Sequence, residues 1–150
     1  MIVYFDTSAL LKAYVQEDGS NEVIAIMDAS ENLFGSIVIT KVEMASAIQR
    51  AVRAIGLSSA SPNAMIAWQD FLEDWDAFNR IRVSAATVEK ASDLAWKYGL
   101  RGYDSLHLAA ALLWRETLDV RISFASFDRN LWLASRQAGL DPWPEGLVQS

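Results

Sequence analysis

The chain has 150 residues, of which 52% are apolar, a formal net charge of −6 and no cysteine. The negative charge argues against a protein that coats nucleic acid through a basic surface, because phosphate contacts are normally made by Lys and Arg. Without cysteine, neither a disulfide framework nor a thiolate metal site can form. The length predicts one domain over residues 1–150. No apolar run is long enough to span a membrane and no basic leader opens the chain, so we expect a cytoplasmic protein with no membrane partner.

Short apolar runs alternate with helical patterns along the chain. In chain order they predict a strand at 2–5, helices at 9–15 and 21–29, a strand at 33–39, a helix at 41–55, a helix from 62 to 78, a short strand at 81–83, helices at 85–97 and 104–116, a strand at 120–125, a helix at 129–137 and a short edge strand near 147–148. This alternation predicts an α/β layered fold, with a mainly parallel central sheet flanked by helices.

Local signals predict where several helices begin and end. Ser20 is expected to cap the helix at 21–29, and the spacing of Thr40 and Glu43 is that of a capping box. Pro62 suits a first helical turn, and Gly99 suits a left-handed cap at a helix end.

The helix after Pro62 carries apolar residues at steps of three and four. We interpret this stripe as a buried helix face rather than a surface that stacks on bases, because the acidic residues beside it would repel a phosphate backbone. The stripe consists of Met65, Trp68, Phe71, Leu72, Trp75 and Phe78.

Four acidic residues stand at junctions between apolar strands and helices: Asp6, Glu43, Asp104 and Asp128. Each alone could simply favour a helix N-terminus. Asp6 and Asp128 directly follow predicted strands, however, and ligands of parallel sheets bind beyond the carboxyl ends of strands. Gathered at that edge, the four carboxylates would repel one another unless a cation compensated them. Carboxylate oxygens suit Mg²⁺ or Mn²⁺, and nearby hydroxyls could support such a site: Thr7, Ser8, Ser105 and Ser126.

These motifs, taken together, resemble the PIN domain, and most closely the small VapC-type toxins of bacteria and archaea. The resemblance covers essentially the whole chain. It depends on Asp-Thr-Ser at 6–8, Glu43, the run Gly-Tyr-Asp-Ser-Leu-His-Leu-Ala at 102–109, and Ser-Phe-Asp at 126–128.

The resemblance implies a parallel sheet sandwiched by helices, with Asp6, Glu43, Asp104 and Asp128 as a metal-binding quartet. It implies Mg²⁺- or Mn²⁺-dependent endonucleolytic cleavage of RNA, a homodimer, and inhibition by a cognate antitoxin protein. We expect hydrolysis by a metal-activated water, with Asp6 and Asp104 holding the main ion. Asp128 would complete its shell or bind a second ion, and Glu43 would ligate directly or orient the water.

The remaining polar candidates are a histidine and three basic residues. His107, the only histidine, lies one turn after Asp104, and we expect it to pack in an apolar helix with a satisfied ring nitrogen. Lys12, Arg101 and Arg129 lie nearest the acidic motifs in sequence, so they are the candidates for contacts with phosphate.

Two alternatives remain open at this stage. A haloacid-dehalogenase-like Mg²⁺-dependent phosphatase would place a second aspartate two residues after the nucleophilic one, but Ser8 occupies that position. A catalytically silent PIN-fold interaction module would fit the acidic surface and the surplus of aromatic residues.

Overall fold

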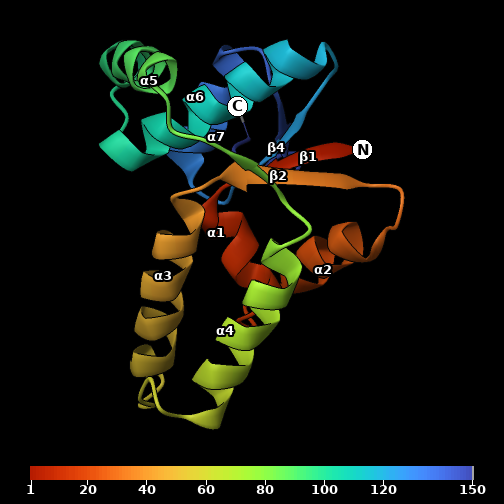
Figure 1. Cartoon of the computed structure of the whole chain (residues 1–150), viewed down its shortest axis with the longest axis vertical. Helices are drawn as coiled ribbons and strands as arrows, with labels where there is room; N and C mark the ends of the chain where they lie inside the picture. The colour runs from red at the N-terminus through yellow and green to blue at the C-terminus, as the bar shows by residue number, and fades with distance from the viewer. Residues whose placement is uncertain (150) are drawn as a thin grey trace.

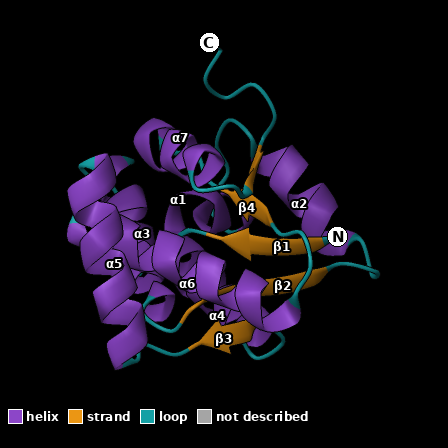
Figure 2. Ribbon diagram, turned by 90° about the horizontal axis from the view of Figure 1, so that it is seen from above, coloured by secondary structure: helices purple, strands orange, loops and turns teal. Residues whose placement is uncertain are grey.

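The computed structural model describes residues 1–149 and confirms the α/β architecture. Five strands form one sheet: β1 (Ile2–Phe5), β2 (Leu33–Ile37), β3 (Asn79–Ile81), β4 (Ser123–Ala125) and β5 (Asp141–Trp143). The helices are α1 (Thr7–Leu10), α2 (Ser20–Asp28), α3 (Thr40–Ala54), α4 (Pro62–Trp75), α5 (Ala85–Tyr98), α6 (Gly102–Leu118) and α7 (Arg129–Gln137), and the 3-10 turn η1 (Leu11–Ala13) continues α1. Figures 1 and 2 show helices on both sides of the sheet.

All strand pairs are parallel, in the order β3-β2-β1-β4-β5. The chain runs outward from β1 to β2 and β3, and later returns to the other side of β1 with β4 and β5. The direction of winding therefore reverses between β1 and β4, whose register pairs Phe5 with Ala125. At such a switch point the loops after the two strands diverge and leave room for a ligand. Asp6 and Ser126 are the residues that follow these two strand ends.

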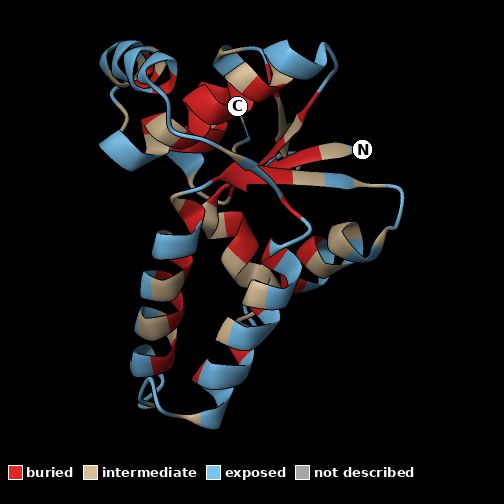
Figure 3. Ribbon diagram, viewed as in Figure 1, coloured by how far each residue is buried: buried red, intermediate tan, exposed pale blue. Residues whose placement is uncertain are grey.

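The strand residues alternate between two apolar cores. Val3 and Phe5 pack with α1, α2, α3 and α4 on one face of the sheet. Tyr4 packs on the other face with Phe124 and with α5, α6 and α7. Figure 3 shows the buried residues of α6 against the sheet. This position of α6 brings its N-terminal turn to the carboxyl edge of the strands.

Gly35 in β2 allows α6 to lie close to the sheet. A Cβ at this position would stand 2.5 Å from the indole ring of Trp114, which packs directly on the strand backbone. Non-bonded carbon atoms do not approach this closely, so any side chain here would force the Trp114 ring, or α6 with it, to move.

The helices α3 and α4 extend away from the sheet as an arm (Figure 1). The predicted stripe on α4 lies in the core at Phe71 and Trp75, and Phe78 just beyond the helix is also buried. The prediction was wrong for Met65, which is 62% exposed. The buried face of this turn carries Ala64 and Ala67 instead, so Met65 lies outside it.

Two of the predicted caps are wrong. The N-cap of α2 is Gly19, with φ of 91°, and the hydroxyl of Ser20 instead accepts from the backbone N–H of Glu17. Thr40 and Glu43 form no capping box, because the Thr40 hydroxyl bonds Ser36. Pro62 in the first turn and the left-handed Gly99 cap are both confirmed.

The C-terminal strand lies earlier than predicted. No strand forms at 147–148, and β5 instead pairs with β4 at the edge of the sheet. Pro142 lies inside β5, where an edge strand tolerates a residue that lacks an N–H. The same segment holds α7, because the indole N–H of Trp132 donates to the carbonyl of Pro144 over 2.9 Å.

Within residues 1–149, no helix combines the length and the apolar character needed to cross a membrane.

Candidate active site

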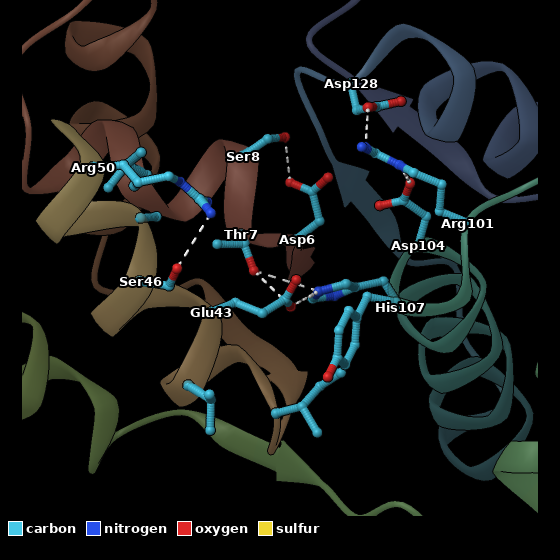
Figure 4. Close-up of a pocket in the computed structure, with 15 residues that line it drawn as sticks. Asp6, Thr7, Ser8, Glu43, Ser46, Arg50, Arg101, Asp104, His107 and Asp128 are labelled. Carbon is cyan, nitrogen blue, oxygen red and sulfur yellow. Dashed lines mark hydrogen bonds and ion pairs between the residues drawn. The ribbon is translucent and has the colours of Figure 1, made fainter. Parts of the chain in front are cut away.

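A cavity of about 500 Å³ opens at the carboxyl edge of the sheet, beside the switch point. Its walls come from α1, α3, the start of α6 and the loop after β4, and Figure 4 shows the side chains that line it. All four predicted acids line this one cavity: Asp6, Glu43, Asp104 and Asp128. Residues far apart in the sequence therefore meet in one place, as the topology requires.

Asp6 lies at the centre of this group and is only 3% exposed. It is the N-cap of α1, and its Oδ1 accepts from the Ala9 N–H over 2.9 Å and from the Ser8 hydroxyl over 2.7 Å. Its Oδ2 accepts from the Ser126 hydroxyl over 2.6 Å. Burial raises the pKa of the Asp6 carboxyl, and the nearby His107 and these hydrogen bonds offset only part of that increase. The carboxylate is held in one orientation at a real electrostatic cost.

Glu43 lies in the first turn of α3, across the cavity from Asp104. Its Oε1 accepts from the Thr7 hydroxyl over 2.9 Å and contacts His107 Nε2 at 2.6 Å. Burial alone would raise the pKa of Glu43, but the interactions with His107, Thr7 and Arg50 together outweigh it, and the pKa is lowered. Glu43 is therefore stabilised as a carboxylate.

Asp104 and Asp128 share one cationic partner, Arg101. The Arg101 Nε donates to Oδ2 of Asp104 over 3.0 Å, and its Nη2 donates to Oδ2 of Asp128 over 3.4 Å. Asp128 is also the N-cap of α7, with Oδ1 accepting from the Leu131 N–H. The Asp104 hydrogen bond is the main reason why the pKa of Arg101 is raised. Because the Arg101 side chain is 80% exposed, it can leave this position at little cost.

Three of the four predicted supporting hydroxyls contact the acids. Thr7 donates to Glu43, and Ser8 and Ser126 both donate to Asp6. Ser8 also accepts from the Phe127 N–H, and Ser126 accepts from the Asp128 N–H. Ser105 differs, because its hydroxyl donates to the Gly102 carbonyl within α6 and does not line the cavity.

The three predicted basic residues also differ in whether they line the cavity. Arg101 lines the cavity, whereas Lys12 and Arg129 do not. Lys12 is bound to the Asp18 carbonyl and the Glu17 carboxylate, and lies over the Phe127 ring, so it holds the start of α2 in place. Sequence reasoning missed Arg50, which does line the cavity. Its spacing of seven residues from Glu43 on α3 was the available signal, because that spacing places both on one helix face.

His107 is buried as predicted, at 1% exposure, but its surroundings are more polar than an apolar helix suggests. Its Nδ1 contacts the Tyr4 hydroxyl at 2.9 Å, and its Nε2 contacts Glu43. Both ring nitrogens are therefore engaged, and one of them faces the cavity.

The donor set fits a hard divalent cation. Four carboxylates but only two guanidinium groups, those of Arg50 and Arg101, line the cavity, so negative charge is in excess there. In the side-chain positions of residues 1–149, no three acidic or histidine groups converge on one point. Mg²⁺ does not require this, since it typically uses one or two carboxylates and completes its shell with water.

Comparison with known proteins gives a consistent result. The family model described as the PIN domain matches residues 3–134. Two Mycobacterium tuberculosis proteins, Ribonuclease VapC45 and Ribonuclease VapC49, are each 32% identical over 139 residues, covering 92% of this chain and 92% of their own length.

Two solved structures share the fold. A toxin-antitoxin complex from Klebsiella pneumoniae superposes with a TM-score of 0.58 at 18% identity, over 84% of this chain and 86% of its own. VapBC2 from Rickettsia felis, bound to a DNA fragment from its promoter, superposes with a TM-score of 0.58 at 13% identity, over 85% and 88%. From the family match, the relatives and the acidic cavity at the switch point, we conclude that this chain belongs to the PIN domain family.

Proposed function

We propose that this protein is a metal-dependent endoribonuclease and the toxin of a VapBC-type toxin–antitoxin pair, with residues 1–150 acting as one domain. The observation that carries the proposal is the meeting of four carboxylates in one cavity at the switch point of the sheet. The relatives named Ribonuclease VapC supply the substrate class, since RNA is what their name says they act on.

The residues that would hold Mg²⁺ or Mn²⁺ are Asp6, Asp104, Asp128 and Glu43. When bound, such an ion supplies Lewis acidity toward a phosphoryl oxygen and lowers the pKa of a water. Asp6 is suited to hold an ion because its hydrogen bonds fix it before any ligand arrives. Asp104 and Asp128 can bind the ion once the Arg101 guanidinium, which bonds both carboxylates, moves away.

The other cavity residues have roles toward RNA. Within residues 1–149, both hydrogen bonds to Glu43 fall on Oε1, so Oε2 is left either to bind the ion directly or to accept from the attacking water and orient it. Arg50 and Arg101 are the cations at the cavity that can contact a phosphate, and a planar guanidinium suits that task. They would bring the RNA backbone toward an otherwise acidic site.

We further propose two protein partners, a cognate antitoxin and a second copy of this chain. Support for the antitoxin comes from the solved relatives, one of which is a toxin-antitoxin complex and the other VapBC2. The phosphatase alternative loses support at Ser8, which stands where that chemistry needs a second acid and instead donates to Asp6.

The test is cleavage of a structured RNA by the purified chain with Mn²⁺ and with a chelator. We expect cleavage only with the ion, and its loss in Asp6→Asn. The matched control is Asp93→Asn on α5, an exposed acid outside the cavity that should cleave like the wild type. Cleavage that survives both the chelator and Asp6→Asn would refute the proposal.

A further inference from the structure

We propose that His107 is a positioning residue that holds the Glu43 carboxylate through a hydrogen-bond relay that begins at the backbone of β2. The inference rests on the function proposed above and adds a residue to it. The relay consists of the Ile37 N–H, the Tyr4 hydroxyl, the His107 ring and the Glu43 carboxylate.

The relay joins three layers of the fold. The Ile37 N–H at the end of β2 donates to the Tyr4 Oη over 3.2 Å. Tyr4 on β1 contacts Nδ1 of His107 on α6 at 2.9 Å. His107 Nε2 then lies 2.6 Å from Oε1 of Glu43 on α3. A carboxylate on the projecting arm is thus connected to the centre of the sheet.

The partners determine where the protons lie. The Tyr4 oxygen already accepts from the Ile37 N–H, and its own proton must find an acceptor because Tyr4 is 0% exposed. His107 Nδ1 lies 2.9 Å from this hydroxyl and can accept that proton. Nε2 carries a proton, which it donates to the Glu43 carboxylate. A bare Nε2 would instead set two lone pairs against each other at 2.6 Å.

Packing keeps the relay rigid. The Tyr4 ring stacks on Phe124 with centroids 5.3 Å apart and planes 5° from parallel. The His107 ring meets Tyr4 edge-on, with centroids 5.9 Å apart. Tyr4 and Phe124 are fully buried and His107 nearly so, and none of the three rings can rotate without displacing the others. Packing of the core therefore holds the hydrogen bond to Oε1 of Glu43 in place. The other oxygen, Oε2, remains available to bind the ion or to orient the attacking water.

The first test needs no RNA. Because His107 is the only histidine, ¹⁵N-histidine labelling of the full chain gives imidazole signals from this residue alone. NMR at neutral pH should show a proton on Nε2, and Tyr4→Phe should shift the Nδ1 signal because it removes the hydroxyl in contact with that nitrogen. An unprotonated Nε2 in the wild type would overturn the proposal. This outcome does not depend on whether the protein cleaves RNA.

The second test compares two substitutions in the RNA cleavage assay. His107→Leu removes the donor and should lower kcat by about 10–100-fold with KM changed less than about twofold. His107→Gln keeps an N–H that can reach Glu43 and should restore kcat to within about threefold of the wild type. Equal loss in both variants, or a near-normal kcat in His107→Leu, would overturn the positioning role. Melting temperatures of both variants identify any loss caused by misfolding, and an inactive wild type would instead count against the proposed function.

Discussion

The Ser126 hydroxyl donates a hydrogen bond to Oδ2 of Asp6 over 2.6 Å, although the two residues are 120 positions apart. The same hydroxyl oxygen accepts from the Asp128 N–H over 3.1 Å. One serine therefore links the two acid-bearing turns that diverge at the switch point between β1 and β4. The spacing of Asp6 and Asp128 depends on this link.

Replacing Ser126 with Ala should lower RNA cleavage about 10–100-fold, because Asp6 loses one of its fixing hydrogen bonds. The free energy of unfolding should fall by about 1–3 kcal/mol, because a buried acceptor and the Asp128 N–H lose their partner. Cleavage rates and urea unfolding measure the two effects. Ser135→Ala is the matched control, because Ser135 is also buried but donates to the Trp132 carbonyl within α7. Equal activity losses in the two variants would contradict a specific role for Ser126.

Asp6→Asn should be more stable than the wild type at neutral pH in the absence of divalent ions. Burial raises the pKa of Asp6 in the folded state above its ordinary value of about 3.9, so the ionised group destabilises the fold at pH values above the folded-state pKa. That cost shrinks as the pH falls through the folded-state pKa and is gone below the ordinary value. Urea unfolding at neutral and at mildly acidic pH should therefore show the advantage of Asn decreasing with acidity. An Asn variant that is less stable at neutral pH would contradict this prediction.

Arg101→Gln should bind Mn²⁺ more tightly and RNA more weakly than the wild type. The guanidinium bridges Asp104 and Asp128 and competes with an ion for both carboxylates. Because the side chain is exposed, we expect only about a three- to tenfold gain in Mn²⁺ affinity by calorimetry. Arg121→Gln is the control, since Arg121 is an exposed arginine paired with Asp141 away from the cavity. Weaker Mn²⁺ binding in Arg101→Gln would show that Arg101 does not compete with the ion.

Gly35→Ala should destabilise the protein by about 1–3 kcal/mol, because the new methyl group meets the Trp114 ring. For a chain of this size that corresponds to a fall in melting temperature of roughly 3–10 °C, measured by calorimetry. Gly56→Ala is an informative comparison, because nothing lies within 4 Å of a Cβ there and only its positive φ opposes the change. If Gly35→Ala had the same melting temperature as the wild type, the Trp114 ring would not pack directly on the strand backbone.

The sequence predicted best what local pattern determines. Asp6 and Asp128 follow apolar runs and cap helices, so their place at the strand ends could be predicted from neighbouring residues alone. Glu43 was placed in the right turn but with the wrong partner. Its capping box with Thr40 was wrong because the side chains of Ser36, Thr7 and His107 compete from other elements.

Other features depend on distant contacts that no local pattern reveals. The contact of Tyr4 with His107 spans 103 positions, and only the packing of α6 on β1 creates it. The bridge from Arg101 to Asp128 depends likewise on the approach of α6 to the loop after β4. The strand β5 was not predicted because it contains Pro142, and a proline argues against a strand. Only its pairing with β4 at the edge of the sheet shows why a proline is tolerated there.

Calorimetric titration of Mn²⁺ into the wild type and into Asp104→Asn tests the central claim most directly. We predict saturable binding to the wild type and at least a roughly tenfold loss of affinity in the variant, because Asp104 would be one of the carboxylates that hold the ion. Equal binding by the two proteins, or none by the wild type, would contradict a metal-dependent nuclease and favour a PIN fold kept for protein interactions.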